Sequence, residues 1–304
     1  MSQRKRSVLM PAAMLAGGVF HDFFTQLNVL TPYLIFIMLF LPFCGADPKK
    51  IRLTGLHGAL LAFQALVSVG IYFLAGLYDR TLAQGAMICV LAPTATSAVV
   101  VAGMLGADIE IMISYSMIVN CSVAVAAPVF FSAIGASAEV SFWELLLTIL
   151  RKVMPLLALP FISALLLRLY APKVADTVKR LSIGSFYLWL VALGIVTGKT
   201  VNFIISQQDG SVTLELLLAV TALAICCLQF AVGRKIGRHW GQTVAGGQSL
   251  GQKNTILAIW MAQNYLDPLC SIAPAAYVLW QNIINSIQLW KKGKEGTSSE
   301  AKHK

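Results

Sequence analysis

Charged residues are scarce in this sequence. They make up 12% of the chain, whereas a soluble globular domain carries roughly a quarter. Hydrophobic residues make up 58%, and they occur in long runs separated by short polar joints. Such runs are typical of membrane spans. The longest polar joint, about 13 residues around 201–213, leaves no room for a soluble catalytic module.

Motifs that carry catalytic or metal chemistry are also scarce. The sequence has no HExxH motif and no pair of carboxylates in the middle of an apolar run, which disfavours a membrane enzyme. The six cysteines form no CxxC pair and lie in or beside apolar runs. There we expect them to be small buried hydrophobic side chains rather than metal ligands or redox groups. We therefore expect no enzymatic activity, no metal and no cofactor.

Positive charge predominates among the few charged residues, and the formal net charge is +10. Such a charge could indicate nucleic-acid binding. The Lys and Arg residues, however, cluster in the joints and tails between apolar runs, a distribution that orients a membrane protein. We therefore expect the lipid bilayer as a partner and no nucleic acid.

Ten apolar runs are predicted to cross the membrane. The first follows MSQRKRS and could be a signal peptide. No small-residue cleavage site leads into a soluble domain, and apolar runs simply continue, so we interpret it as the first span. The expected spans are 8–24, 27–46, 54–77, 82–105, 108–135, 143–170, 179–199, 213–236, 243–264 and 267–291.

The positions of the basic residues predict the orientation. With a cytoplasmic N-terminus, ten spans return the C-terminus to the same side. Eighteen of the 23 Lys and Arg residues then lie on the cytoplasmic side, four lie outside, and Lys253 lies within a span. This asymmetry predicts a multi-pass protein of the plasma membrane (the bacterial inner membrane) with both termini cytoplasmic. The polar tail 292–304 is expected to be disordered.

Two of the spans contain residues that disfavour a regular helix. In the fourth span, Pro93 removes a backbone donor, and the hydroxyl residues Thr94, Thr96 and Ser97 follow it. In the ninth span, the run 246–255 contains three glycines and six polar residues. A proline can be only a kink, and hydroxyl residues can serve helix packing. Paired interruptions at matching positions, however, are typical of transporters with inverted repeats.

The predicted fold is therefore all-α and polytopic, a single membrane domain over 1–304. It has ten transmembrane helices in two inverted five-helix repeats, residues 1–138 and 139–291. The fourth and ninth helices are broken and cross at the membrane midplane, which would bring residues 93–97 and 247–253 close together.

Lys253 is the least expected residue of the ninth span. A lysine near the bilayer centre costs about 2.5–3.5 kcal/mol on insertion scales, so it needs a functional or pairing reason. Its ammonium could be a tethered cation that donates to carbonyls freed at residues 93–96, with Gln64, Gln248 and Gln252 as the best-placed side-chain acceptors. It could instead exchange a proton during transport, pair with an anionic substrate, or snorkel into a cavity connected to the cytoplasm.

Three stretches resemble motifs of the bile acid:sodium symporter family. Residues 92–97 match a Cys-Pro-Gly-Gly-Thr-Ala motif, residues 248–254 match Glu-Val-Gly-Met-Gln-Asn-Ser, and residues 279–286 are close to Val-Trp-His-Asn-Ile-Ser-Gly-Ser. Gln64 also matches a family glutamine. The resemblance covers the ten-span layout and implies alternating access, in which a panel domain rocks against a core domain. It also implies two sodium ions bound behind the crossing of the broken helices.

The departures from the family pattern concern the sodium ligands. The family's Ser-Asn pair falls on Ala98 and Val99, its glutamate on Gln248 and its asparagine on Lys253, and one fifth-span hydroxyl position falls on Met112. Sodium is a hard cation that needs oxygen ligands. The resemblance therefore implies sodium symport, whereas the residues argue against it.

These observations predict a secondary active transporter for a small organic anion, either bile-acid-like or a carboxylate or sulfonate metabolite. A proton or sodium is the candidate coupled ion. The alternatives are an ion channel and a non-transporting membrane sensor or scaffold that retains the transporter fold. The residues expected to form the substrate or ion site are Gln64, Pro93, Thr94, Thr96, Ser97, Ser116, Gln248, Gln252, Lys253, Asn254 and Asn282.

Overall fold

Helices account for all of the regular secondary structure in the described part of this computed structural model. The structure describes residues 3–44, 52–95, 97–135, 141–181, 185–206 and 211–302. The all-α prediction is confirmed for these ranges. In chain order the elements are α1 (Gln3–Val19), α2 (His21–Gln26), η1 (Leu27–Leu30), α3 (Thr31–Phe43), α4 (Gly55–Gly76), α5 (Arg80–Leu91), α6 (Ser97–Met104), α7 (Ile109–Gly135), α8 (Phe142–Tyr170), α9 (Pro172–Leu181), α10 (Ser185–Ser206), α11 (Val212–His239), α12 (Thr243–Gly251), α13 (Thr255–Tyr265), η4 (Pro268–Ser271) and α14 (Ile272–Lys302).

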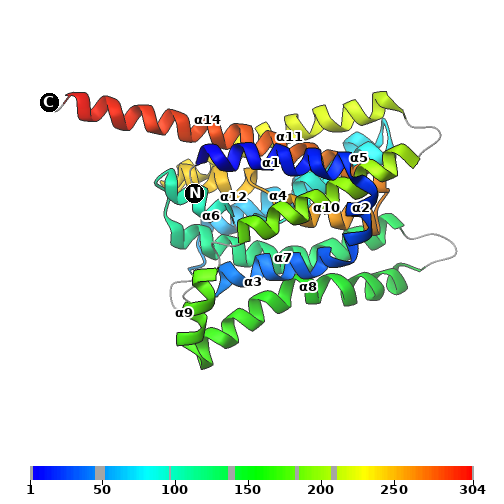
Figure 1. Cartoon of the computed structure of the whole chain (residues 1–304), viewed down its shortest axis with the longest axis horizontal. Helices are drawn as coiled ribbons and strands as arrows, with labels where there is room; N and C mark the ends of the chain where they lie inside the picture. The colour runs from blue at the N-terminus through cyan, green and yellow to red at the C-terminus, as the bar shows by residue number, and fades with distance from the viewer. Residues whose placement is uncertain are drawn as a thin grey trace.

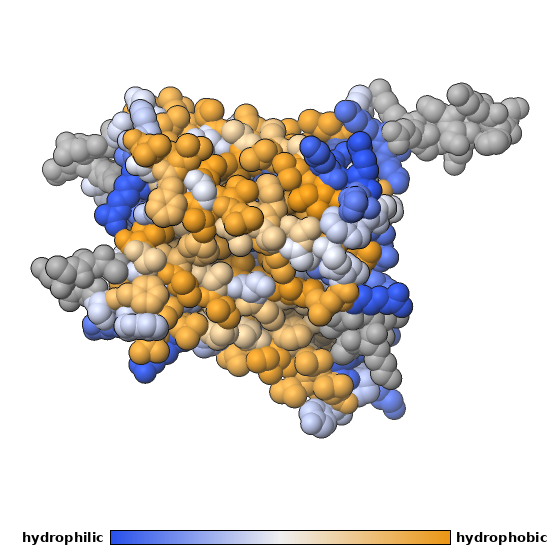
Figure 2. All heavy atoms as spheres, turned by 180° about the vertical axis from the view of Figure 1, so that it is seen from behind, coloured by the Kyte–Doolittle hydropathy of each residue, from blue (hydrophilic) through white to orange (hydrophobic). Residues whose placement is uncertain are grey.

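Five helical segments in the described ranges are long and apolar enough to cross a membrane. Their exposed residues are largely hydrophobic, as with Leu66 and Phe73 on α4. Figure 2 shows hydrophobic residues in a broad band across the molecule, with hydrophilic residues gathered at its two ends. An apolar outer surface of this kind is stable in lipid rather than in water, so the chain is a membrane protein. The five segments are His21–Leu41, Gly55–Gly76, Ile109–Gly135, Phe142–Tyr170 and Val212–His239.

The axes of the long helices are roughly aligned, and both termini lie at the same end of the molecule (Figure 1). Side-chain oxygens fix several of the helix starts, because the first backbone amides of a helix have no partner within it. Asp79 accepts from Leu82 N at 2.7 Å before α5, and Asn254 accepts from Leu257 N at 3.3 Å before α13. Ser141 and Ser211 do the same before α8 and α11.

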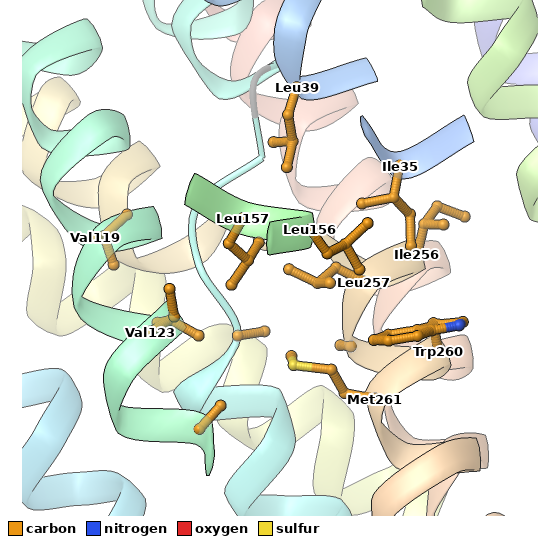
Figure 3. Close-up of a cluster of buried hydrophobic side chains, with 14 of the residues drawn as sticks. Ile35, Leu39, Val119, Val123, Leu156, Leu157, Ile256, Leu257, Trp260 and Met261 are labelled. Atoms are coloured by element: carbon orange, nitrogen blue, oxygen red, sulfur yellow. The ribbon is translucent and has the colours of Figure 1, made fainter. Parts of the chain in front are cut away.

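A continuous apolar core joins helices from both halves of the chain. In Figure 3, Ile35 and Leu39 of α3 face Leu156 and Leu157 of α8, with residues of α13 beside them. Val119 and Val123 of α7 close the cluster on the other side. These side chains are almost fully buried, and within a membrane their contacts are favoured by van der Waals packing. The cluster fixes the position of α13, which begins at the second interruption.

Glycines allow α11 and α12 to pack with their backbones in contact. A Cβ at Gly233 would lie 2.3 Å from Gly246 O, and a Cβ at Gly246 would lie 2.3 Å from Gly233 O. A Cβ at Gly237 would meet Gln242 O at the same distance. No larger residue fits at these positions without separating the helices. Two of the glycines predicted to interrupt the ninth span, Gly246 and Gly247, therefore lie within a regular helix and serve packing.

One expected boundary is wrong. The sequence predicts a seventh span over 179–199, whereas α9 ends at Leu181 as a separate short helix and α10 covers Ser185–Ser206. The described part of α14 ends at Lys302, and the disorder expected over 292–304 stays a prediction. Lys292 Nζ donates to Leu105 O at 2.7 Å, which ties this part of α14 to the end of α6.

Candidate functional site

The two predicted interruptions meet as a pair of short extended segments. Ala95 N donates to Gln252 O at 3.0 Å, and Asn254 N donates to Pro93 O at 2.8 Å. These bonds form an isolated antiparallel bridge between Thr94 and Lys253. The predicted proximity of the two interruptions is therefore confirmed. Each extended segment separates two half-helices, α5 from α6 and α12 from α13.

The Lys253 side chain binds a backbone carbonyl near the end of α5. The last carbonyls of a helix have no partner within it, and Pro93 cannot donate a backbone N–H. Lys253 Nζ donates to Val90 O at 2.8 Å, and the side chain is 1% exposed. Cations near a helix C-terminus interact favourably with the helix dipole. Snorkelling of this lysine to a solvent-connected cavity is therefore wrong.

Two buried glutamines satisfy the other free carbonyls of α5. Gln64 Nε2 of α4 donates to Leu91 O at 2.8 Å and to Ala92 O at 3.2 Å. Its Oε1 accepts from Tyr115 OH at 3.2 Å, which fixes the orientation of the carboxamide. Gln229 Nε2 of α11 donates to Cys89 O at 3.2 Å. The end of α5 is therefore held by side chains from α4, α11 and the second interruption.

The end of α12 is held in a corresponding way. Thr94 Oγ1 donates to Ser249 O at 2.5 Å, and Tyr277 OH of α14 donates to Gly251 O at 2.9 Å. The backbone N–H of Lys253 donates to Gln281 Oε1, also on α14, at 2.8 Å. The break in this helix therefore leaves its buried backbone groups with partners from α14 and from the opposite segment, as irregular backbone at membrane depth requires.

The predicted side-chain acceptors for Lys253 make other contacts. Gln64 donates to the end of α5, as described, and Gln252 Nε2 donates to Ser97 Oγ at 2.9 Å. Gln248 Nε2 donates to Asn285 Oδ1 at 3.0 Å and to Gln288 Oε1 of α14 at 3.1 Å. The expectation that these glutamines surround the ammonium is therefore wrong. The Lys253 side chain reaches toward α5. Gln248, five residues earlier in the chain, faces α14.

The remaining predicted site residues differ in their contacts. Asn254 caps α13, and Ser116 is buried on α7 with a hydroxyl oxygen that lacks a hydrogen-bond partner. Asn282 Nδ2, by contrast, donates to Val278 O of its own helix at 2.6 Å. Met112, at a hydroxyl position of the family pattern, lies 3.4 Å from Ser249 Oγ through its Sδ. Thr96 lies outside the described residues.

Several residues of the site are not predicted from the sequence. Gln229 and Tyr277 contact each other at 3.0 Å, and each supports one of the two broken helices. Gln281 binds the backbone at the bridge. A polar side chain inside an apolar run was the available signal for both glutamines, since such residues are rare in membrane spans unless they face the interior.

Buried polar atoms without a partner occur in several parts of the described bundle, including the crossing. An unpaired buried polar group costs about 1–3 kcal/mol, so each is a candidate contact for water or a bound solute. Those on residues near the crossing are Ser116 Oγ, Gln229 Oε1, Gln248 Oε1, Gln252 Oε1, Thr255 Oγ1 and Asn285 Nδ2. Within the described residues, no cluster of His, Cys, Asp or Glu could hold a metal ion.

The run 247–251 also has the G-x-S-x-G spacing of a hydrolase nucleophile. That motif acts on a sharp strand-to-helix turn that exposes the serine. Here Ser249 lies inside α12, is buried, and directs its hydroxyl to Met112 Sδ. The spacing therefore does not mark a catalytic nucleophile.

Comparison of the sequence with protein-family models finds no matching family, and comparison with curated proteins finds no significant match. The family resemblance therefore rests on the three quoted stretches and on Gln64 alone.

Proposed function

We propose that this protein is a secondary active transporter that moves a small organic anion across the membrane by alternating access. The bridge between Thr94 and Lys253 carries the proposal. Broken helices in transporters place half-helix ends and free backbone groups at a site where a solute can bind.

The packing of the helices supports an arrangement of ten spans in two inverted repeats. In this arrangement, α1, α2–α3, α4, α5–α6 and α7 correspond to α8, α10, α11, α12–α13 and α14. Contacts occur in matching pairs: α1 packs on α10 as α3 packs on α8, and α4 packs on α5 as α11 packs on α12. The side-chain bonds at the crossing also match between the two proposed repeats. Thr94 and Lys253 occupy equivalent positions, and each binds the carbonyl that lies four residues before the other.

The bonds made by Lys253 support a tethered cation at the crossing. Sodium needs several oxygen ligands, and the family's ligand positions here hold Ala98, Val99 and Met112, which offer none. The Lys253 side chain instead places a nitrogen donor on Val90 O, a free carbonyl of α5. We therefore propose that transport does not require sodium. The lysine would stabilise the crossing in every state of the transport cycle.

The half-helices that begin at the crossing support an anionic substrate. Backbone amides at a helix N-terminus carry partial positive charge and bind carboxylate or sulfonate groups. α13 begins at Thr255, whose buried Oγ1 has no partner, and Gln252 Oε1 nearby is also unpaired. A hydrated or hydroxylated organic anion could satisfy both atoms beside this helix end. The polarity of this end of α13 supports an anionic substrate.

Uptake into proteoliposomes tests the proposal. Anionic metabolites are first screened for thermal stabilisation of the purified protein, because a ligand that binds the folded state raises its melting temperature. The stabilising compounds are then assayed for uptake with sodium or potassium inside and outside. Saturable uptake in both salts supports the proposal. Flux that rises linearly with substrate indicates a channel, and binding without uptake indicates a sensor or scaffold.

A further inference from the structure

The short helix α9 differs from every long helix in direction and in sequence pattern. It runs across the direction of the long helices at the end of the molecule that carries both termini (Figure 1). Its sequence, PKVADTVKRL, holds three basic residues and one acidic residue within ten positions. Its place and its composition fit a helix in the plane of a membrane surface rather than one that spans it.

The side chains of α9 separate into three faces. Ala175 is fully buried and Val178 is packed against the apolar core, so this face attaches the helix to the bundle. Val174 and Leu181 are 50% and 62% exposed and form an apolar edge beside it. Lys173 and Arg180 are exposed and point away from the attached face. The helix therefore presents apolar and basic side chains next to each other on its free surface.

The end of α8 extends this surface. Tyr170 is 84% exposed and Leu169 is also exposed, immediately before α9 begins. Tyrosines are enriched at the boundary between lipid tails and headgroups, because the ring is apolar and the hydroxyl is polar. An exposed tyrosine between the apolar span α8 and the basic face of α9 therefore marks the level of the headgroups.

The charges on this surface are only partly neutralised within the protein. Arg168 of α8 pairs with Asp176, the acidic residue of α9. Lys173 and Arg180 form no ion pair within the described part of the chain. They are seven residues apart, which places them on the same face of a helix at a spacing of about 10 Å. Two long, flexible cationic side chains at that spacing can converge on one lipid phosphate.

We propose that the free surface of α9 and Tyr170 bind the headgroup of an anionic phospholipid. Lys173 and Arg180 contact the phosphate, while Val174, Leu181 and Leu169 contact the acyl chains below it. Anionic lipid attracts basic residues with a gain of about fivefold in affinity per charge, and the apolar edge is continuous with the lipid-facing surface of α8. The inference depends on the membrane location of the chain and not on transport.

Native mass spectrometry of the delipidated protein in detergent tests this inference. The protein is titrated with phosphatidylglycerol and, separately, with phosphatidylcholine. The double variant K173Q/R180Q should weaken binding of the first phosphatidylglycerol molecule about 25-fold and leave phosphatidylcholine binding unchanged. K173R/R180K keeps both charges and should bind as the native chain does.

The matched control is K235Q/R238Q, which removes two exposed charges from the end of α11. It should retain the first phosphatidylglycerol adduct. Equal losses in the two double variants would show a general charge effect and overturn the local site. Unchanged binding by K173Q/R180Q would also overturn it, and so would displacement of the lipid by inorganic phosphate at equal concentration, which would indicate a phosphate site without acyl-chain contacts.

Discussion

Thr94 and Lys253 each bind the helix end that precedes the other. Thr94 Oγ1 lies 2.5 Å from Ser249 O, four residues before Lys253, and Lys253 Nζ lies 2.8 Å from Val90 O, four residues before Thr94. A carbonyl four residues back is the acceptor that each residue's own N–H would use in a continuous helix. The crossing therefore exchanges acceptors between the two broken helices. The donor is a threonine hydroxyl in one of these bonds and a lysine side-chain nitrogen in the other.

Replacing Lys253 by methionine should reduce both stability and transport. The variant K253M keeps the length of the side chain but leaves Val90 O without a donor in a buried site. We expect a loss of about 1–3 kcal/mol in the free energy of unfolding and no measurable uptake. Thermal unfolding of the purified protein and proteoliposome uptake measure the two effects. The control is K235M, which alters an exposed lysine of α11; equal behaviour of both variants would exclude the tethered-cation role.

Transport by the native chain should be insensitive to sodium. Uptake measured in sodium and in potassium at equal ionic strength should agree within about twofold, because the oxygen ligands of the family's sodium sites are missing. The double variant K253N/Q248E restores two of the family's residues and should gain a sodium response. A steep, saturable dependence on sodium in the native chain would instead show that backbone carbonyls at the crossing form a cation site.

The bonds of Thr94 and Lys253 should be energetically coupled. T94V removes the hydroxyl that binds Ser249 O and should cost about 1 kcal/mol, whereas T94S retains the donor and should cost less. In a double-mutant cycle with K253M, the two losses should differ from additivity by about 0.5–3 kcal/mol, since both bonds hold the same pair of segments. Strict additivity in thermal unfolding would mean that the two helix ends are stabilised independently.

The glycine contact between α11 and α12 provides a test of packing. G246A places a Cβ 2.3 Å from Gly233 O, and overpacking of this kind costs about 1–3 kcal/mol. The matched control is G58A in α4, where a Cβ would meet no atom within 4 Å. Alanine is favoured over glycine in a helix by about 1 kcal/mol, so G58A should unfold at the same temperature or higher. Similar melting temperatures for the two variants would contradict the close contact.

The proximity of the two interruptions could be predicted from the sequence because it depends on residue type and order. Pro93 and the polar run of the ninth span disfavour continuous helices, and their matching positions point to a common site. The acceptor of Lys253 could not be predicted in this way. A lysine side chain reaches several residues along either neighbour, and only the register of the extended segments decides that it ends at Val90 rather than at residues 93–96.

The helix α9 was missed for a different reason. Its basic residues lie between the sixth and seventh apolar runs. The sequence therefore predicts a polar joint there, followed by the start of the seventh span. Its amphipathic pattern covers only ten residues, and a pattern of this length does not distinguish a surface helix from a loop. Attachment of Ala175 and Val178 to the bundle stabilises the helix, and such packing is not visible from the local sequence.

The bond between Lys253 and Val90 has a consequence for biosynthesis. α12 and α13 are 9 and 11 residues long, each too short to cross a bilayer alone, and the buried Lys253 side chain takes its acceptor from α5. The ribosome completes α5 long before it reaches Lys253, so the acceptor is already in the membrane when the lysine emerges. We therefore expect insertion of α12 and α13 to depend on prior insertion of α5, and a chain with its two halves in the reverse order would lack this template.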